Sequence, residues 1–123
     1  MWIVTLRMYH GTRPTSEVTE KLGIEPSGEH LAGWDEEARS TAQNGWFLGS
    51  EGAVEARKLD DHLSWLIASV GAGWGNLDSL RAAGWDADVD CSGEAGVDGP
   101  FRLRAETLAF IGTHGLDLQI RIW

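Results

Sequence analysis

The sequence has 123 residues, a formal net charge of −9, 42% hydrophobic residues and seven tryptophans. This length suits a single domain over residues 1–123 with one modest core, and the apolar fraction argues against a disordered chain. The negative charge argues against binding to nucleic-acid phosphates or to anionic membrane surfaces, because both require a basic face. It leaves a basic protein, a cationic ligand or a metal as classes of partner, with solubility alone as the other explanation.

Cysteine usage and targeting signals narrow the class further. Cys91 is the single cysteine, which excludes an intrachain disulfide and a cysteine-based zinc site. The first residues lack the basic segment and the cleavage site of a signal peptide. No apolar run approaches the roughly eighteen residues of a membrane span. We therefore expect a cytoplasmic protein.

The first predicted element is a strand at residues 2–9, because apolar and polar side chains alternate there. A two-turn helix follows it. Pro14 favours the first turn, and Thr15 or Ser16 can cap the free N–H groups. Gly23 favours the end of the helix through a left-handed conformation. Each residue has a structural reason here, and nothing in this segment demands a ligand.

The middle of the chain contains the clearest helix. Residues 27–45 show little apolar periodicity and predict a long loop, with a helical turn at residues 35–39 as an option. Residues 45–50 predict a short strand. Residues 53–70 carry one apolar stripe at helical spacing and predict a long amphipathic helix.

The last third alternates helices with amphipathic strands. A short helix is predicted at residues 76–84, with Asn76 as its cap. Strict alternation predicts a strand at residues 85–91 with one solvated face. A helix at residues 104–113 and an alternating strand at residues 116–123 complete the chain.

The predicted order is therefore strand, helix, strand, helix, helix, strand, helix, strand. Amphipathic strands indicate a sheet with one covered face and one solvated face. We expect an α+β two-layer sandwich with a mainly antiparallel sheet of about four strands and helices on one face. A ferredoxin-like plait is one such arrangement.

Three aspartates on one predicted strand are the sharpest chemical feature. Asp86, Asp88 and Asp90 alternate along the strand, so they share one face at a spacing of about 7 Å. Their repulsion calls for a cation, a basic partner, or a solvated face or edge that discourages aggregation. The spacing resembles a calcium loop, but Cys91 stands where such a loop needs glycine and Val97 where it needs glutamate. We expect no metal site there.

Other candidate motifs indicate structure more than chemistry. The glycine-rich run at residues 71–76 closes a helix, whereas a phosphate-binding loop follows a strand. The four histidines lack any paired ligand spacing, and His62 beside Trp65 on the long helix indicates packing. Cys91 faces inward on its strand and indicates a small core residue more than a nucleophile. We expect no catalytic residue and no cofactor.

The tryptophans divide into two groups. Trp46, Trp65 and Trp85 fit packing between the sheet and the helices. The others in predicted loops or at the end of the chain could anchor a partner or fold onto the rim of the core. They are Trp34, Trp74 and Trp123.

Four segments together resemble a known family. They are PTSEVTEKLGIEPSGEHLAG, GWFLGS, LDDHLSWLIASV and LAFIGTHGLDLQIRIW. Their pattern is a capped helix ending in Leu-Gly-Ile-x-Pro, a Trp-x-Leu-x-Ser strand, a helix with a His-Leu step and an alternating last strand. It resembles the bacterial family of domain of unknown function 4279 over nearly the whole chain. The resemblance implies a small, single-domain cytosolic protein and transfers no catalytic residues.

Small acidic families of this kind often resemble immunity proteins, which neutralise a toxin by masking it. We therefore expect a non-enzymatic protein-binding domain, an immunity or inhibitor protein that masks a basic partner. The residues assigned to the contact are Asp86, Asp88, Asp90 and Asp117. The alternative is a small-molecule sensor whose ligand cleft is closed by residues 27–45, and an enzyme using Cys91 and a histidine ranks third. A homodimer through an uncovered face or edge stays open.

Overall fold

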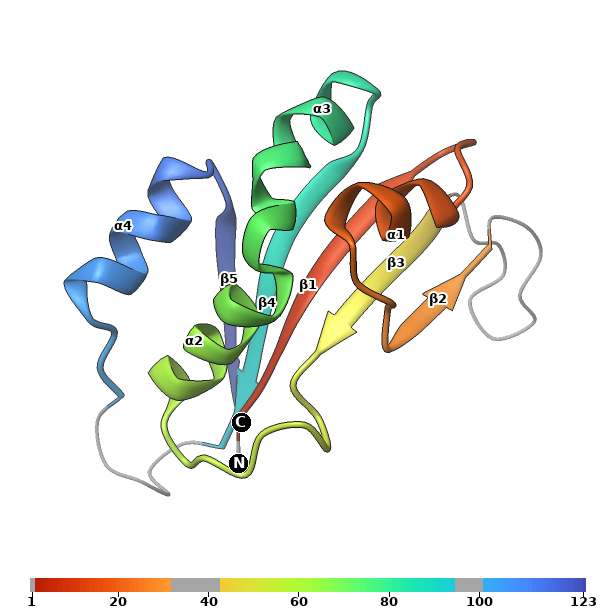
Figure 1. The fold of residues 1–123 in the computed structure, drawn as a ribbon. Helices are drawn as coiled ribbons and strands as arrows, with labels where there is room; N and C mark the ends of the chain where they lie inside the picture. The colour runs from red at the N-terminus through yellow and green to blue at the C-terminus, as the bar shows by residue number, and fades with distance from the viewer. Residues whose placement is uncertain (1, 32–42, 95–100) are drawn as a thin grey trace.

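A computed structural model describes residues 2–31, 43–94 and 101–123, and Figure 1 shows its arrangement. The strands are β1 (Ile3–His10), β2 (Gly28–His30), β3 (Asn44–Gly49), β4 (Asp86–Gly93) and β5 (Asp117–Ile122). The helices are α1 (Ser16–Leu22), α2 (Leu59–Val70), α3 (Leu77–Ala82) and α4 (Ala105–Thr113), with a 3-10 helix, η1 (Gly71–Asn76), between α2 and α3. None of the helices in the described part of the chain is long and apolar enough to cross a membrane.

The five strands form one mixed sheet in the order β2-β3-β1-β4-β5. β1 runs antiparallel to β3 and β4, β2 runs antiparallel to β3, and β5 runs parallel to β4. The elements from β1 to β4 have the strand order and directions of a ferredoxin-like plait. The helix α4 is the crossover that a parallel neighbour requires, and it adds β5 to this plait. The predicted α+β class and mainly antiparallel sheet are confirmed.

The helices cover one face of the sheet (Figure 1). On the central strand β1, the side chains of Val4, Leu6 and Met8 point toward the helices and are completely buried. The side chains between them point to the opposite face, which no helix in the described residues covers. The amphipathic alternation predicted a covered face and a solvated face, and β1 has both.

One strand, the start of one helix and the conformation of residues 71–76 differ from the prediction. The expected loop at residues 27–45 contains β2, whose three residues are too few to show a periodic pattern. Its optional helical turn at residues 35–39 lies outside the described residues. The long helix begins at Leu59 rather than at residue 53. The run at residues 71–76 follows α2 directly as a 3-10 helix, so it forms no phosphate-binding loop.

The predicted capping residues serve other bonds. Thr15 precedes α1 without a side-chain capping bond, and its hydroxyl donates to the Glu29 carboxylate on β2 instead. Asn76 makes no capping bond to α3, and its amide donates to the Lys21 carbonyl at 2.8 Å. These polar side chains therefore connect separate elements. Gly23 ends α1 in the left-handed conformation, with φ at 73°, as its type predicted.

The tryptophans mostly pack. Trp46 and Trp85 are buried, and Trp65 packs partly buried against the core. Trp74 is 5% exposed in η1, and its indole donates to the Ile67 carbonyl at 3.0 Å, so it folds onto the core. Trp123 is exposed at the end of the chain. Trp34 lies outside the described residues.

The contact between α1 and η1 requires a glycine. A Cβ on Gly73 would lie 2.0 Å from the Leu22 carbonyl oxygen, a backbone atom that cannot turn away. Lys21, the residue before Leu22, is held by the Asn76 amide from the same 3-10 helix. The end of α1 is therefore fixed against η1 at close backbone distance.

We predict that Gly73→Ala lowers the free energy of unfolding by about 2–3 kcal/mol, because the backbones of η1 and α1 must separate. Gly75→Ala is the matched control, since a Cβ at Gly75 meets nothing within 4 Å. It should change stability by no more than about 0.5 kcal/mol. Urea denaturation of both variants measures this difference, and equal losses would contradict the close contact.

Candidate functional site

The uncovered face of the sheet carries the aspartates singled out in the sequence. β4 lies between β1 and β5, so each of its side chains has a neighbour on both sides. Arg7 of β1 stands opposite Asp88, and Asp88 stands opposite Asp117 of β5. The aspartate strand is therefore an interior strand. The explanation that its charge protects an edge does not apply.

Two arginines of the same chain neutralise two of the aspartates. The Arg7 guanidinium donates to both Asp88 carboxylate oxygens, at 2.7 and 2.6 Å. The Arg121 guanidinium of β5 donates to both oxygens of Asp90, at 3.1 and 2.7 Å. Arg7 also lies 3.9 Å from Asp90, whose side chain is 9% exposed. The hydrogen bond to Asp88 raises the pKa of Arg7 above its usual value, against the opposing effect of burial.

The other two aspartates assigned to the contact have no such partner. Asp86 and Asp117 are exposed, and within the described residues neither carboxylate makes a hydrogen bond or an ion pair. The four predicted contact residues thus divide into two that are paired internally and two that face solvent uncompensated. Free negative charge on this face is concentrated at Asp86 and Asp117.

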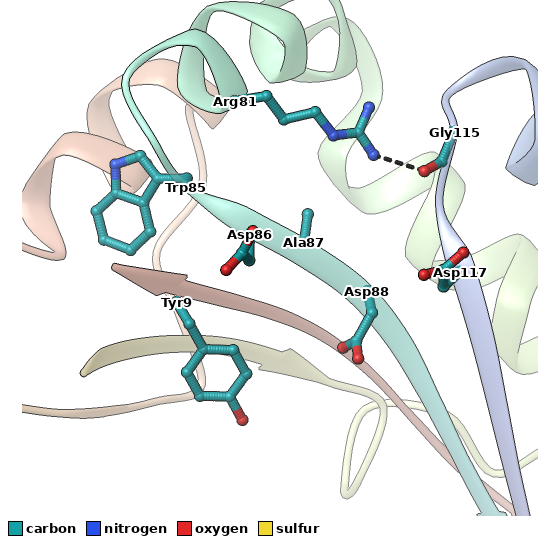
Figure 2. Close-up of a pocket in the computed structure, with 8 residues that line it drawn as sticks. All are labelled: Tyr9, Arg81, Trp85, Asp86, Ala87, Asp88, Gly115 and Asp117. Carbon is teal, nitrogen blue, oxygen red and sulfur yellow. Dashed lines mark hydrogen bonds between the residues drawn. The ribbon is translucent and has the colours of Figure 1, made fainter. Parts of the chain in front are cut away.

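These free carboxylates border a hollow of about 470 Å³ at one end of the sheet (Figure 2). Figure 2 shows Tyr9, Asp86 and Asp88 on one side of β4 and Ala87 on the other. The side chains that give the hollow its chemistry are Tyr9, Arg81, Trp85, Asp86, Asp88 and Asp117. The hollow therefore combines carboxylates with aromatic surface and with the Arg81 guanidinium on its rim.

The fold places Asp86 and Asp117 at the start of two parallel strands. Asp86 is the first residue of β4 and Asp117 the first of β5, so both lie at the amino end of this strand pair. Arg81 of α3 donates to the His114 carbonyl and, at 2.9 Å, to the Gly115 carbonyl just before β5. This bond ties α3 to the turn that leads into Asp117 and fixes the rim of the hollow.

Trp85 is held at the other wall. Its indole N–H donates to Glu17 of α1 at 2.9 Å. Arg13 also binds Glu17, and this ion pair lowers the pKa of the Glu17 carboxyl, with burial opposing and the Trp85 bond assisting. The carboxylate of Glu17 is thus already satisfied, and it orients Trp85.

An aromatic cluster continues the same face toward the opposite edge of the sheet. The rings of Tyr9 and Phe47 lie 5.6 Å apart at an angle of 73°, and the rings of His30 and Phe47 lie 5.3 Å apart. Edge contacts of this kind stabilise aromatic pairs. Tyr9 belongs both to this cluster and to the hollow, so apolar surface adjoins the free carboxylates.

The exposed carboxylates beside Tyr9 can bind a cation, whereas Cys91 and His62 lie in the core. No group of three or more histidine, cysteine or acidic side chains in the described residues is placed to hold a metal ion. Cys91 is completely buried, and burial, assisted by Asp90, raises the pKa of its thiol to about 12. His62 is buried as well, bonded to the Ser50 hydroxyl at 2.8 Å and the Ala56 carbonyl at 2.6 Å. Both residues have the packing role that the sequence indicated.

Sequence reasoning missed the two arginines. The alternation places Arg7 and Arg121 on the solvated faces of the first and last predicted strands, which is the available signal. Their pairing with the aspartates depends on strand order, because β4 must lie between the two arginine-bearing strands. Nothing in the local pattern reveals that order.

Comparison with known proteins identifies one family. The family model described as "Domain of unknown function (DUF4279)" matches residues 1–123, the whole chain, which confirms the resemblance carried by the four sequence segments. No curated protein and no solved structure matches the chain.

The division of the aspartates predicts different costs for the same substitution. Asp90→Asn should lower the free energy of unfolding by about 2 kcal/mol, because it weakens charge-assisted bonds to Arg121 beside Arg7. Asp86→Asn, four residues earlier on the same face of β4, should change the free energy of unfolding by no more than about 0.5 kcal/mol. Chemical denaturation measures both. Equal effects would show that the arginine pairs do not distinguish these carboxylates.

Burial of Cys91 predicts slow thiol chemistry in the folded protein. At pH 8 we expect a disulfide reagent such as dithiobis-nitrobenzoate to label the folded chain at least about a hundredfold more slowly than the urea-unfolded chain. The thiol pKa rises from 9.0 to about 12 on folding, so its stabilising contribution is full below pH 9.0 and is lost as the pH rises toward 12. Rapid labelling of the folded protein at pH 8 would contradict this environment.

Proposed function

Since the chain belongs to the DUF4279 family, we propose its function from the geometry of the site. The protein is a non-enzymatic binding domain that masks a basic protein partner, as immunity and inhibitor proteins do. The observation that carries the proposal is the pair of exposed carboxylates of Asp86 and Asp117 at the hollow, neither of which forms an ion pair within the described residues. An unpaired surface carboxylate gains most when a partner supplies the opposite charge.

The contact centres on Asp86 and Asp117 rather than on all four aspartates. Asp88 and Asp90 already bind Arg7 and Arg121, so a partner would have to break those bonds to reach them. The position of Tyr9 beside the free carboxylates suits a lysine or arginine side chain. The aliphatic part of the partner's lysine or arginine would pack on the Tyr9 ring, and its cationic group would contact both the ring and the Asp86 carboxylate.

The charge of the whole chain supports the same class of partner. A net charge of −9 on 123 residues attracts a basic protein over a distance comparable to the Debye length and accelerates association. The aromatic cluster of Tyr9, His30 and Phe47 offers apolar surface beside the charged end of the face. Protein interfaces commonly combine charged residues, which steer association, with aromatic residues, which supply contact area.

The second candidate is a sensor for a small cationic molecule. The volume of the hollow, about 470 Å³, lies within the range of about 300–1,000 Å³ that ligand pockets occupy. The carboxylates of Asp86 and Asp117 would select a polyamine or a guanidinium compound. The residues expected to close over a ligand, 27–45, lie largely outside the described part of the chain.

The test captures partners with immobilised protein from a lysate of the source organism, at low and at high salt, with mass spectrometric identification. We expect a basic protein to bind the wild type in stoichiometric amount and to bind Asp86→Asn at least about tenfold more weakly. High salt should weaken the wild-type complex. Asp86→Asn is chosen because the Arg7 and Arg121 pairs stay intact in this variant.

Glu20→Gln is the matched control, because it removes one exposed carboxylate on α1, away from the hollow. It should bind the partner as the wild type does. Equal binding by wild type and Asp86→Asn would contradict the assigned contact. If no protein binds but spermidine or arginine raises the melting temperature of the wild type and not of Asp86→Asn, the sensor replaces the binding domain.

A further inference from the structure

The outer edge of β5 is an unpaired strand edge. β5 is the last strand of the sheet, and among the described residues nothing pairs with its outer side. The Trp123 N–H donates to the Gly93 carbonyl of β4 at 3.1 Å, so the odd-numbered residues of this segment direct their backbone groups inward. Leu118 and Ile120 therefore direct their N–H and C=O groups outward. An edge of this kind is a template for another strand.

The helix next to this edge has an apolar face without a partner. Four of its residues recur at helical spacing and are all exposed: Ala105, Leu108, Ala109 and Gly112. Leu108 is 49% exposed, and a Cβ on Gly112 would meet nothing within 4 Å. α4 contacts α2 and β5 through its other side, where Thr107 and Ile111 are buried (Figure 1). The apolar face thus points away from the molecule at the same border as the β5 edge.

The side chains of β5 are complementary to a second β5. Asp117, Gln119 and Arg121 share the uncovered face, so the strand has an acidic end, a neutral centre and a basic end. If two copies pair antiparallel about Gln119, Asp117 of each copy stands opposite Arg121 of the other. Opposite charges in directly opposed positions stabilise a strand pair, and like charges destabilise it.

Backbone geometry permits this register. Pairing about Gln119 places Leu118 opposite Ile120 of the second copy, and both residues direct their hydrogen-bonding groups outward. The charged residues then occupy the non-hydrogen-bonded positions, where opposed side chains lie closest. A register centred on Leu118 pairs Gln119 with Asp117 of the other copy. A register centred on Ile120 pairs Gln119 with Arg121. Centring on Asp117 opposes two carboxylates. The register about Gln119 alone among these gives two opposite-charge pairs.

We propose that two copies of this chain form a homodimer through β5 and α4, paired about Gln119. The two sheets join into one ten-stranded sheet, and the apolar faces of the two α4 helices lie on the same side of it. The occupant is a second copy because the charge order of β5 complements itself. Asp117 of each copy pairs with the Arg121 guanidinium of the other, which keeps its bonds to Asp90. In the dimer Asp86 is therefore the carboxylate left at the hollow for the basic partner, and Asp86→Asn tests that contact separately.

Sedimentation velocity of the full chain over a range of protein concentrations tests the dimer. The wild type should sediment with twice the monomer mass of 13.4 kDa. Asp117→Arg places an arginine opposite Arg121 of the other copy at both ends of the interface. This repulsion should raise the dimer dissociation constant at least about tenfold. Leu108→Asp, which charges the apolar face of α4, should also weaken the dimer. Glu20→Arg makes the same charge change as Asp117→Arg on α1, far from β5, and should leave the dimer intact.

A charge swap isolates the two ion pairs. Asp117→Arg mixed with Arg121→Asp should restore a dimer, because each chain then carries one sign at both positions and complements the other. Arg121→Asp also removes the partner of Asp90, so its melting temperature is measured first; if it does not fold, Asp117→Arg and Leu108→Asp decide. A wild type that stays monomeric at all concentrations overturns the proposal. So does a dimer that Asp117→Arg and Leu108→Asp leave unchanged.

Discussion

The bidentate bonds from Arg7 to Asp88 and from Arg121 to Asp90 are the constraint on which the site depends. β4 carries three carboxylates on one face and lies between two strands. Their mutual repulsion therefore has to be balanced by side chains of the neighbouring strands. The neighbours on both sides supply one arginine each: Arg7 stands directly opposite Asp88, and Arg121, which stands opposite Ser92, reaches Asp90 diagonally. Charge neutralisation across three strands therefore accompanies the pairing of β4 with β1 and β5, and a shift in register would separate these charges.

The same neutralisation decides which acidic residues remain available. Once two aspartates of β4 are paired, the free negative charge lies at Asp86 and at Asp117, where β4 and β5 begin. The parallel crossover through α4 brings those two ends together beside Tyr9. The proposed binding surface is thus a consequence of topology: the β5 strand that neutralises Asp90 also contributes the second free carboxylate.

Much of the fold follows from local patterns. Alternation predicted β1, β4 and β5, and the apolar stripe predicted α2, because both periodicities record which side chains face the core. The sequence did not reveal β2, since three residues show no period, or the roles of Thr15 and Asn76, whose polar groups bind distant elements. The aspartates were recognised from their spacing. The sequence did not show which of these carboxylates are paired and which are free, because that depends on which strands flank β4.

The division of the aspartates by internal arginines is tested by a double-mutant cycle between Arg7 and Asp88, with Arg7→Met, Asp88→Leu and the double variant compared by urea denaturation. A second cycle is measured between Arg7 and Asp86, which has no arginine partner. We expect a coupling free energy of about 1 kcal/mol or more for Arg7 with Asp88 and close to zero for Arg7 with Asp86. Equal couplings, or none in the first cycle, would contradict the claim that internal arginines divide the aspartates.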